Sequence, residues 1–414
     1  MTGSRLRLRR DLILLTLVFV PLFALDVYAM HSVFTSRYPG ANDFFSRWKG
    51  AEVFWREGLD PYSDEATLAI QEGIYGRAAR PGEDPGPFAY PFYTVFLLAP
   101  LTLLSYAWAE AVWLVVLQFS LIGGVLLCLM LVDWRLPRWL AAFTSLWAVA
   151  FYHSARTIFL GQFAGLVFLW TAGALWALRK DHSVVAGVLL ALTTIKPQMS
   201  VLLTPALLIW GVGQRRWLFL SSFAATMALL LGASFLLLPN WLGEFIAQVL
   251  RYPSYTAIGS PVWIVTQYYL PFLGKPGELV LSALLFLYLL VQCRQLPRIR
   301  ANSQWFLWLV GLILLVTNLI VLRTATTNYV VLYIPLFLIL KMAADRLIRA
   351  PLWLALFYTL SVVGLWALFL TTVQGDYENP IMYLPLPSIL LPGILWAKEA
   401  RNPASVGQQS RMGR

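Results

Sequence analysis

The chain has 414 residues, of which 59% are hydrophobic and only 12% are charged. Soluble domains carry about 25% charged residues, so this composition, with a mean hydropathy of +0.69, excludes a soluble domain and predicts an all-α polytopic membrane protein. The net charge of +11 fits the Lys and Arg excess of cytoplasmic loops and an affinity for membrane lipids, and it does not indicate a nucleic-acid partner.

Apolar segments of about 20 residues, the length needed to cross a bilayer, recur along the whole chain. The first follows a cluster of arginines and predicts an uncleaved membrane helix with a cytoplasmic N-terminus. Alternation of basic loops then predicts about 12 transmembrane helices. For the alternation to hold, either 89–105 is a re-entrant or surface-lying segment, which we favour, or Arg135 and Arg138 break the charge rule. The candidate segments are 12–30, 89–105, 110–132, 139–155, 160–178, 184–213, 217–238, 277–296, 304–322, 329–347, 352–373 and 380–397.

The loops between these segments define the domain organisation. Two predicted outer loops are long, at 31–88 and 239–276. We expect one integral membrane domain over 1–397, followed by a polar, basic cytoplasmic tail at 398–414. This organisation places the protein in the cell membrane as a multi-pass chain.

The first outer loop contains a polar, acidic stretch that is unusual in this chain. From Asp43 to Glu57 apolar residues recur with helical period, and Gly58 can end a helix, so we predict an amphipathic helix on the outer membrane surface. Asp43 stands where that helix begins. It is either the helix N-cap or a general base that takes a proton from an attacking hydroxyl. Asp60, before Pro61, is typical of a turn.

Lys196 lies within the apolar segment 184–213, directly before Pro197. Because proline breaks a helix, we predict two short helices that meet at the outer face. An ionisable residue inside the membrane is a functional candidate, and a lysine there can bind a phosphate. The alternative is that its side chain snorkels to the outer interface.

Three further cations lie on the predicted outer side, against the usual charge bias of membrane proteins. Arg156 and Arg323 lie at junctions between membrane segments, and Arg251 lies in the second outer loop. They indicate either an anionic group held at the outer leaflet or pairing with loop carboxylates and lipid headgroups. Gln162 begins the helix that follows Arg156.

Several kinds of chemistry have no sequence support. The sequence contains no Walker A loop, GxSxG elbow, DxD motif or HExxH helix. The two cysteines and three histidines lack the spacing of a zinc site. We therefore expect no metal and no cofactor.

Six short motifs occur in a characteristic order: Asp43-Phe44-Phe45, Gly58-Leu59-Asp60-Pro61-Tyr62, Phe88-Ala89-Tyr90-Pro91-Phe92, Ala99-Pro100-Leu101, Gly161-Gln162 and Ile195-Lys196-Pro197-Gln198. In these motifs the chain, over roughly residues 40–345, resembles glycosyltransferase family 87. This GT-C-fold group includes polyprenol-phosphate-mannose-dependent α-(1→2)-mannosyltransferases.

The resemblance implies an inverting hexosyltransferase that moves a sugar, mannose, from a polyprenyl-phosphate donor to a glycolipid or glycan acceptor. The donor is a substrate rather than a cofactor, and the active site lies on the outer, extracytoplasmic face. The resemblance also implies an aspartate of the first outer loop as catalytic base, which corresponds to Asp43. We predict that the leaving phosphate is bound by fixed cations, namely Lys196, Arg156 and Arg323.

One stretch departs from the family pattern. Members similar to the mannosyltransferases carry a histidine before an aromatic residue near the outer end of a late helix, where this chain has Asn328-Tyr329. Asparagine can donate a hydrogen bond but carries no charge, which weakens the inference to mannose and leaves Arg323 to supply the charge. The predicted substrate-binding residues are Asp60, Tyr62, Gln162, Asn328, Tyr329 and Arg251.

Two other classes stay open. A lipid-linked sugar transporter or flippase would show inverted repeats and broken helices, of which the chain has one, at Lys196-Pro197. An O-antigen ligase or polymerase-like protein usually has its largest outer loop late in the chain, whereas the acidic loop here comes early.

Overall fold

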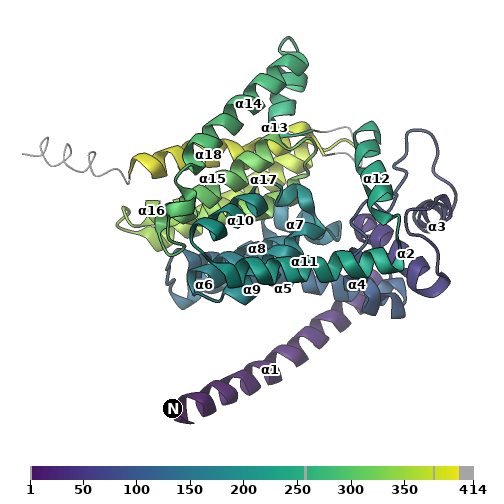
Figure 1. The fold of residues 1–414 in the computed structure, drawn as a ribbon, viewed down its shortest axis with the longest axis horizontal. Coiled ribbons are helices and arrows are strands. Elements are labelled where there is room, and N and C mark those ends of the chain that lie inside the picture. Colours follow the sequence, from purple (N-terminus) through teal and green to yellow (C-terminus); the bar gives the residue numbers. More distant parts are fainter. Residues whose placement is uncertain (1, 256–258, 376–377, 401–414) are drawn as a thin grey trace, which may run out of the picture. The chain divides into compact units, whose positions relative to one another are not determined.

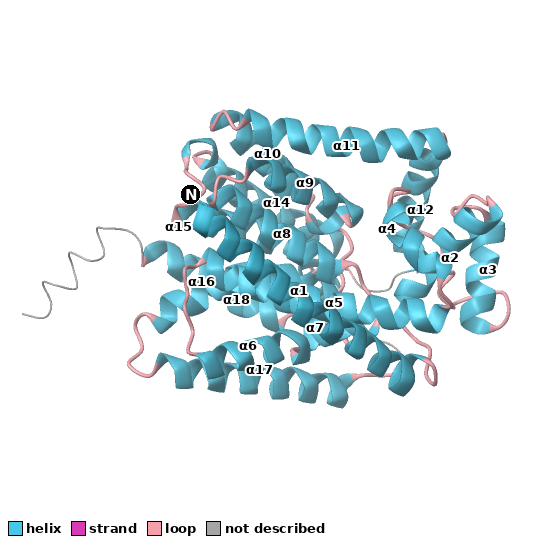
Figure 2. Cartoon of the chain, turned by 90° about the horizontal axis from the view of Figure 1, so that it is seen from below, coloured by secondary structure: helices cyan, strands magenta, loops and turns pink. Residues whose placement is uncertain are grey.

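The computed structural model describes residues 2–255, 259–375 and 378–400, with the backbone alone for residues 2–15, 42 and 252–255. Within these ranges the chain is all-helical, as predicted, and Figure 2 shows helices joined by loops with no strand. The predicted tail at 398–414 lies almost entirely outside the described residues. The helices group into two compact units.

Unit 1 comprises the chain up to Phe88, together with Thr94–Phe119 and Ile158–Gln162. Its elements are α1 (Thr2–Met30), the π-helical η1 (His31–Thr35), α2 (Asn42–Glu57), α3 (Asp64–Tyr75), α4 (Thr94–Leu98), the 3-10 helix η2 (Ala99–Leu103) and the first half of α5 (Tyr106–Leu131).

Unit 2 comprises Ala89–Tyr93, Ser120–Thr157 and the chain from Phe163 onward. Its longer helices, labelled in Figure 1, are α6 (Arg138–Ala150), α7 (Tyr152–Phe159), α8 (Ala164–Arg179), α9 (Ser183–Leu192), α10 (Leu203–Gly213), α11 (Trp217–Leu237), α12 (Trp241–Tyr255), α14 (Gly274–Cys293), α15 (Gln304–Ile320), α16 (Tyr333–Ala344), α17 (Ala350–Thr372) and α18 (Pro385–Glu399). The short elements are η3 (Thr193–Ile195), η4 (Pro197–Met199), α13 (Pro261–Trp263), η5 (Ile264–Tyr269), η6 (Leu296–Arg298), η7 (Thr326–Leu332) and η8 (Pro380–Tyr383).

Seven helical segments in the described ranges are long and apolar enough to cross a membrane, judged by length and composition. Large apolar side chains are exposed along α11, α14 and α17, for example Leu236 at 85% and Leu360 at 61%. Apolar surface on this scale is unfavourable in water, so the fold is that of a polytopic membrane protein. The seven segments are Thr16–Thr35, Tyr106–Leu131, Trp217–Leu237, Gly274–Arg298, Thr326–Ala344, Ala350–Thr372 and Pro380–Glu399.

Unit 2 is built around α15, whose residues from Phe306 to Leu319 are all buried. Helix α9 packs on both α8 and α11, and Gly187 permits the close approach because a Cβ there would meet Ser222 Oγ at 2.1 Å. Figure 2 shows α6 and α17 side by side, joined by the hydroxyl pair Thr144–Tyr358 at 3.2 Å.

The break predicted at Lys196-Pro197 is present. Helices α9 and α10 are short and are separated by two 3-10 turns, η3 and η4, with Lys196 between them in a non-helical conformation. The segment 89–105 is also broken: residues 89–93 are not helical, and α4 with η2 gives ten residues of helix at 94–103. Ten residues are about half the length of a membrane span, which agrees with the predicted non-spanning segment.

Candidate active site

The helix predicted from Asp43 to Glu57 is α2, and Gly58 ends it in the left-handed conformation at φ 70°. Much of its apolar face packs against protein in unit 1, while Trp55 stays 42% exposed, and the predicted contact with the outer membrane surface stays a prediction. Phe44 stacks on Trp113 with ring centroids 5.0 Å apart, and Trp48 Nε1 donates to the carbonyl of Leu101 at 3.0 Å. Helix α2 is therefore a rigid part of unit 1.

Asp43 is not the N-cap of α2. The helix begins one residue earlier than predicted, and the cap position belongs to Ala41, which adopts a left-handed conformation with φ 49°. The Tyr106 hydroxyl stabilises this turn by donating a hydrogen bond to the carbonyl oxygen of Gly40 at 2.5 Å. The Asp43 carboxylate is thus free of the capping role and lies in the first turn of the helix, where negative charge is favoured.

A contact distant in sequence orients this carboxylate. Gln162 Nε2 donates to Asp43 Oδ2 at 2.6 Å, which brings together two of the predicted site residues. Gly161 forms the turn before Gln162 with φ +65°. Trp113 Nε1 donates a hydrogen bond to the Gly161 carbonyl oxygen at 2.7 Å and so fixes this turn.

The second carboxylate oxygen of Asp43, Oδ1, has a weaker contact. Arg47 approaches Oδ1 only at 3.5 Å, because its guanidinium turns back to the Asp43 carbonyl at 2.7 Å. The Asp43 side chain keeps 34% of its surface exposed. One oxygen is therefore fixed by Gln162, while the other can accept a proton from a substrate hydroxyl.

Asp60 and Tyr62 have visible local roles in the same unit. Asp60 Oδ1 accepts from the backbone N–H of Tyr62 at 2.8 Å, the side-chain turn that the Asp-Pro sequence predicts. Tyr62 is 6% exposed, and its ring packs edge to face on the Phe88 ring with centroids 5.4 Å apart. The structure thus shows how both residues shape the loop after α2.

Lys196 belongs to unit 2 and is 3% exposed. Protein atoms cover this side chain, which is not the arrangement of a lysine that snorkels to an interface. A role of Lys196 in binding the donor phosphate stays a prediction.

The other predicted cations lie on different elements of unit 2. Arg156, on α7, lies over the Phe369 ring at 5.5 Å, and Arg323 lies over the Trp263 ring at 5.8 Å. Arg251 is exposed on α12. Asn328 and Tyr329 are buried in η7, where the Tyr329 hydroxyl donates to the Tyr383 carbonyl at 3.0 Å.

Glu378 was not predicted from the sequence. It follows α17 and accepts hydrogen bonds from Tyr152 and from Thr326, whose Oγ1 lies 2.7 Å from Oε1 and 2.9 Å from Oε2. Burial raises the pKa of this carboxyl, whereas the two hydrogen bonds and the charge of Arg156 act in the opposite direction. The available signal was two acids, Asp376 and Glu378, in a short polar loop between the last two apolar segments.

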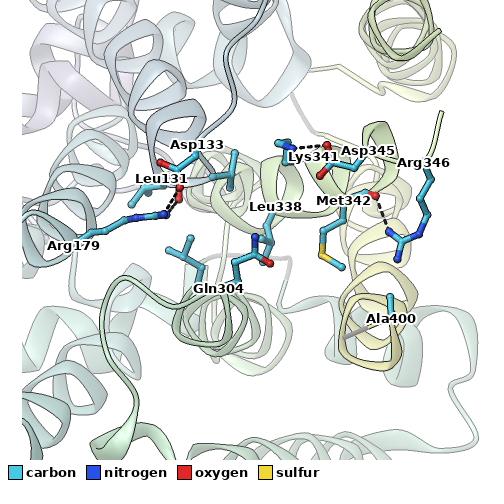
Figure 3. Close-up of a pocket in the computed structure, with 12 residues that line it drawn as sticks. Leu131, Asp133, Arg179, Gln304, Leu338, Lys341, Met342, Asp345, Arg346 and Ala400 are labelled. Atoms are coloured by element: carbon cyan, nitrogen blue, oxygen red, sulfur yellow. Dashed lines mark hydrogen bonds and ion pairs between the residues drawn. The ribbon is translucent and has the colours of Figure 1, made fainter. Parts of the chain in front are cut away.

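A pocket of about 420 Å³ lies elsewhere in unit 2, at the C-terminal ends of α5, α8 and α16 (Figure 3). Arg179 pairs with Asp133 and Lys341 with Asp345 along its wall. These charges lie at the ends of α5, α8 and α16 or directly after them, and none of the predicted site residues lines the pocket. Within the described residues, no three His, Cys, Asp or Glu side chains are grouped to hold a metal ion.

Comparison with protein families matches residues 88–322 to the family described as Glycosyltransferase family 87. This range is more than half of the chain. It contains Arg156, Gln162 and Lys196 and lies C-terminal to Asp43. Comparisons with curated proteins and with solved structures found no match.

Proposed function

Because the chain belongs to glycosyltransferase family 87, and is therefore a membrane glycosyltransferase, we propose that it transfers a hexose from a polyprenyl-phosphate donor to a glycolipid or glycan acceptor. The family resemblance of the motifs supports mannose as the hexose and the outer face of the cell membrane as the place of reaction. A transporter or flippase is not the activity of this family, and the chain shows one broken apolar segment rather than a matched pair.

The observation that carries the proposal is how the Asp43 carboxylate is oriented and what it contacts. Its carboxylate is oriented by Gln162 through Oδ2, is not used as a cap, and belongs to a side chain that is 34% exposed, with Arg47 at 3.5 Å from Oδ1. A general base needs a fixed carboxylate with one oxygen open to the proton that it removes.

In the proposed reaction the acceptor hydroxyl gives its proton to Asp43 Oδ1. The hydroxyl oxygen forms a bond to the anomeric carbon as the bond from that carbon to the phosphate oxygen breaks. The electron pair of the broken bond stays on the polyprenyl phosphate, and the anomeric configuration inverts. Lys196 and Arg323 are the proposed cations that stabilise the charge on this leaving group.

Asp43→Asn in the purified protein tests the base. With a polyprenyl-phosphate mannose donor, we expect turnover to fall by about 10²- to 10⁴-fold while the apparent Tm stays unchanged. Asp64→Asn is the matched control because Asp64 is an exposed acid of the same loop, in the first turn of α3. Turnover of Asp43→Asn equal to that of the control would remove Asp43 as the base.

Lys196→Met tests the donor phosphate. We expect the KM for the donor to rise by at least tenfold, since a hydrogen bond to a charged group contributes about 1.5–3 kcal/mol, with little change in the KM for the acceptor. Lys180→Met, at an exposed lysine of the same unit, is the control. An unchanged donor KM in Lys196→Met contradicts the phosphate-binding role.

A further inference from the structure

Six polar residues of unit 2 form what we call the Glu378 cluster. They come from α7, from η7 and from the loop that follows α17. The loop between α17 and η8 brings Glu378 to Thr326, 52 positions away in the sequence, and to Tyr152, 226 positions away. The members are Tyr152, Arg156, Thr326, Thr327, Asn328 and Glu378.

The Glu378 carboxylate can accept more hydrogen bonds than it receives from the described residues. An ionised carboxylate has about four acceptor positions. Its donors among the described residues are the Tyr152 hydroxyl and the single proton of Thr326 Oγ1, which Oε1 and Oε2 share. Glu378 is partly exposed, and its carboxylate has acceptor positions that these donors leave open.

Three more polar atoms of the cluster are buried without a hydrogen-bond partner among the described residues: Arg156 Nε, Thr327 Oγ1 and Asn328 Oδ1. Thr327 is 1% exposed and Asn328 is 3% exposed. Leaving such an atom unsatisfied costs about 1–3 kcal/mol, and native proteins rarely do so. Arg156 acts on the Glu378 carboxylate through its charge, and Thr327 and Asn328 directly follow Thr326, which donates to it; the three atoms therefore indicate a place on α7 and η7 where a polar ligand completes the hydrogen bonds.

The chemistry of these atoms selects the ligand. Arg156 Nε donates, Asn328 Oδ1 and Glu378 Oε2 accept, and a threonine hydroxyl does either. An ionised phosphate only accepts, and the Glu378 charge repels it. Sugar hydroxyl groups both donate and accept and carry no charge, so they match all four atoms.

We propose that the Glu378 cluster binds hydroxyl groups of a sugar that takes part in the transfer. This inference rests on the proposed function and moves Arg156 from the donor phosphate to the sugar. Glu378 is then a specificity-determining residue, and the sugar belongs to either the donor or the acceptor.

Steady-state kinetics of Glu378→Gln with polyprenyl-phosphate mannose distinguish the two sources of the sugar. The amide keeps the shape but replaces one acceptor oxygen by a donor, so we expect the KM for one sugar substrate to rise by at least tenfold. A rise for the donor assigns the cluster to the transferred sugar, and a rise for the acceptor assigns it to the acceptor. Glu72→Gln, at an exposed acid of α3, is the control.

Deoxy analogues of the affected substrate separate binding from a structural role. The wild type should lose at least tenfold in kcat/KM when the contacted hydroxyl is missing, and Glu378→Gln should not distinguish the analogue from the parent sugar. An equal loss for the analogue in both proteins, or unchanged KM values in Glu378→Gln, overturns the proposal. Asn328→Ala provides the same comparison if Glu378→Gln does not fold.

Binding without turnover keeps the test independent of the proposed donor. Methyl α-mannoside should raise the apparent Tm of the wild type and leave that of Glu378→Gln unchanged. If the wild type transfers nothing from polyprenyl-phosphate mannose, the proposed donor fails while this binding assay still decides on the cluster. If no methyl hexoside of a panel including mannoside, glucoside and galactoside stabilises the wild type, the sugar site is refuted.

Discussion

Gly161→Ala is the sharpest test of how the chain positions Asp43. Gly161 has φ +65°, and a Cβ there would lie 2.5 Å from the Cβ of Phe44 and 3.1 Å from that of Ala41. A left-handed conformation costs a residue with a Cβ about 1–2 kcal/mol, and overpacking of this kind costs about 1–3 kcal/mol. The substitution should therefore destabilise unit 1 by about 2–5 kcal/mol in total.

Relief of the clash must push α2 and the turn at 161 apart, because Phe44 and Ala41 belong to the start of α2 and to its cap. This separates Gln162 from Asp43, and we expect kcat to fall together with stability. Gly76→Ala is the matched control. Gly76 has φ +67°, but nothing among the described residues lies within 4 Å of an added Cβ, so that variant carries the backbone strain alone.

The assay measures the fraction of soluble, monodisperse protein after heating at a fixed rate, in parallel with the transfer rate. We expect the apparent Tm of Gly161→Ala to lie on the order of 5–10 °C below the wild type, and that of Gly76→Ala to lie between the two. Equal stability and equal activity of the two variants would refute the account of this turn.

Three further predictions follow from the same contacts. Trp113→Phe removes the hydrogen bond to the Gly161 carbonyl and should cost about 1–3 kcal/mol, seen as a lower apparent Tm. Gln162→Ala should lower kcat by about tenfold, and Gln162→Glu should lower it at least as far because a carboxylate cannot donate a hydrogen bond to Asp43. An unchanged kcat in both variants contradicts the Asp43–Gln162 contact. Burial raises the pKa of Glu378 above its ordinary 4.5. As the pH falls through the raised pKa, the carboxylate becomes protonated and activity should fall. The free energy of unfolding should rise over the same pH range, because the folded state binds this proton more tightly than the unfolded state. Glu378→Gln should lack this opposite movement of activity and apparent Tm.

Local sequence patterns predicted the parts of the fold that depend on neighbouring residues. The periodicity from Asp43 to Glu57 and the glycine at 58 gave the extent of α2 to within one residue, and Pro197 marked the break between α9 and α10. Both features follow from the backbone preferences of short stretches. The helix at 64–75 was missed, although Ser63 caps it by accepting from the Ala66 N–H at 3.1 Å.

The candidate site was predictable only where a short motif marked it. Asp43 and Gln162 each lie in such a motif, and the structure joins them across 119 positions. The face of α2 was predicted to meet the membrane because periodicity shows that a helix side is apolar without showing what covers it. Glu378 has no local pattern, and its significance comes from Tyr152 and Thr326, which only the tertiary fold brings beside it.

The support of α2 by protein has a practical meaning for work in detergent. Trp48 and Trp55 anchor the helix to the carbonyls of Leu101 and Val95, each at 3.0 Å, so its placement does not rely on lipid headgroups. The orientation of the Asp43 carboxylate should then be the same in micelles, nanodiscs and native membranes. Differences in transfer rate between these environments would report on how the lipid-linked substrate reaches the enzyme rather than on the integrity of the base.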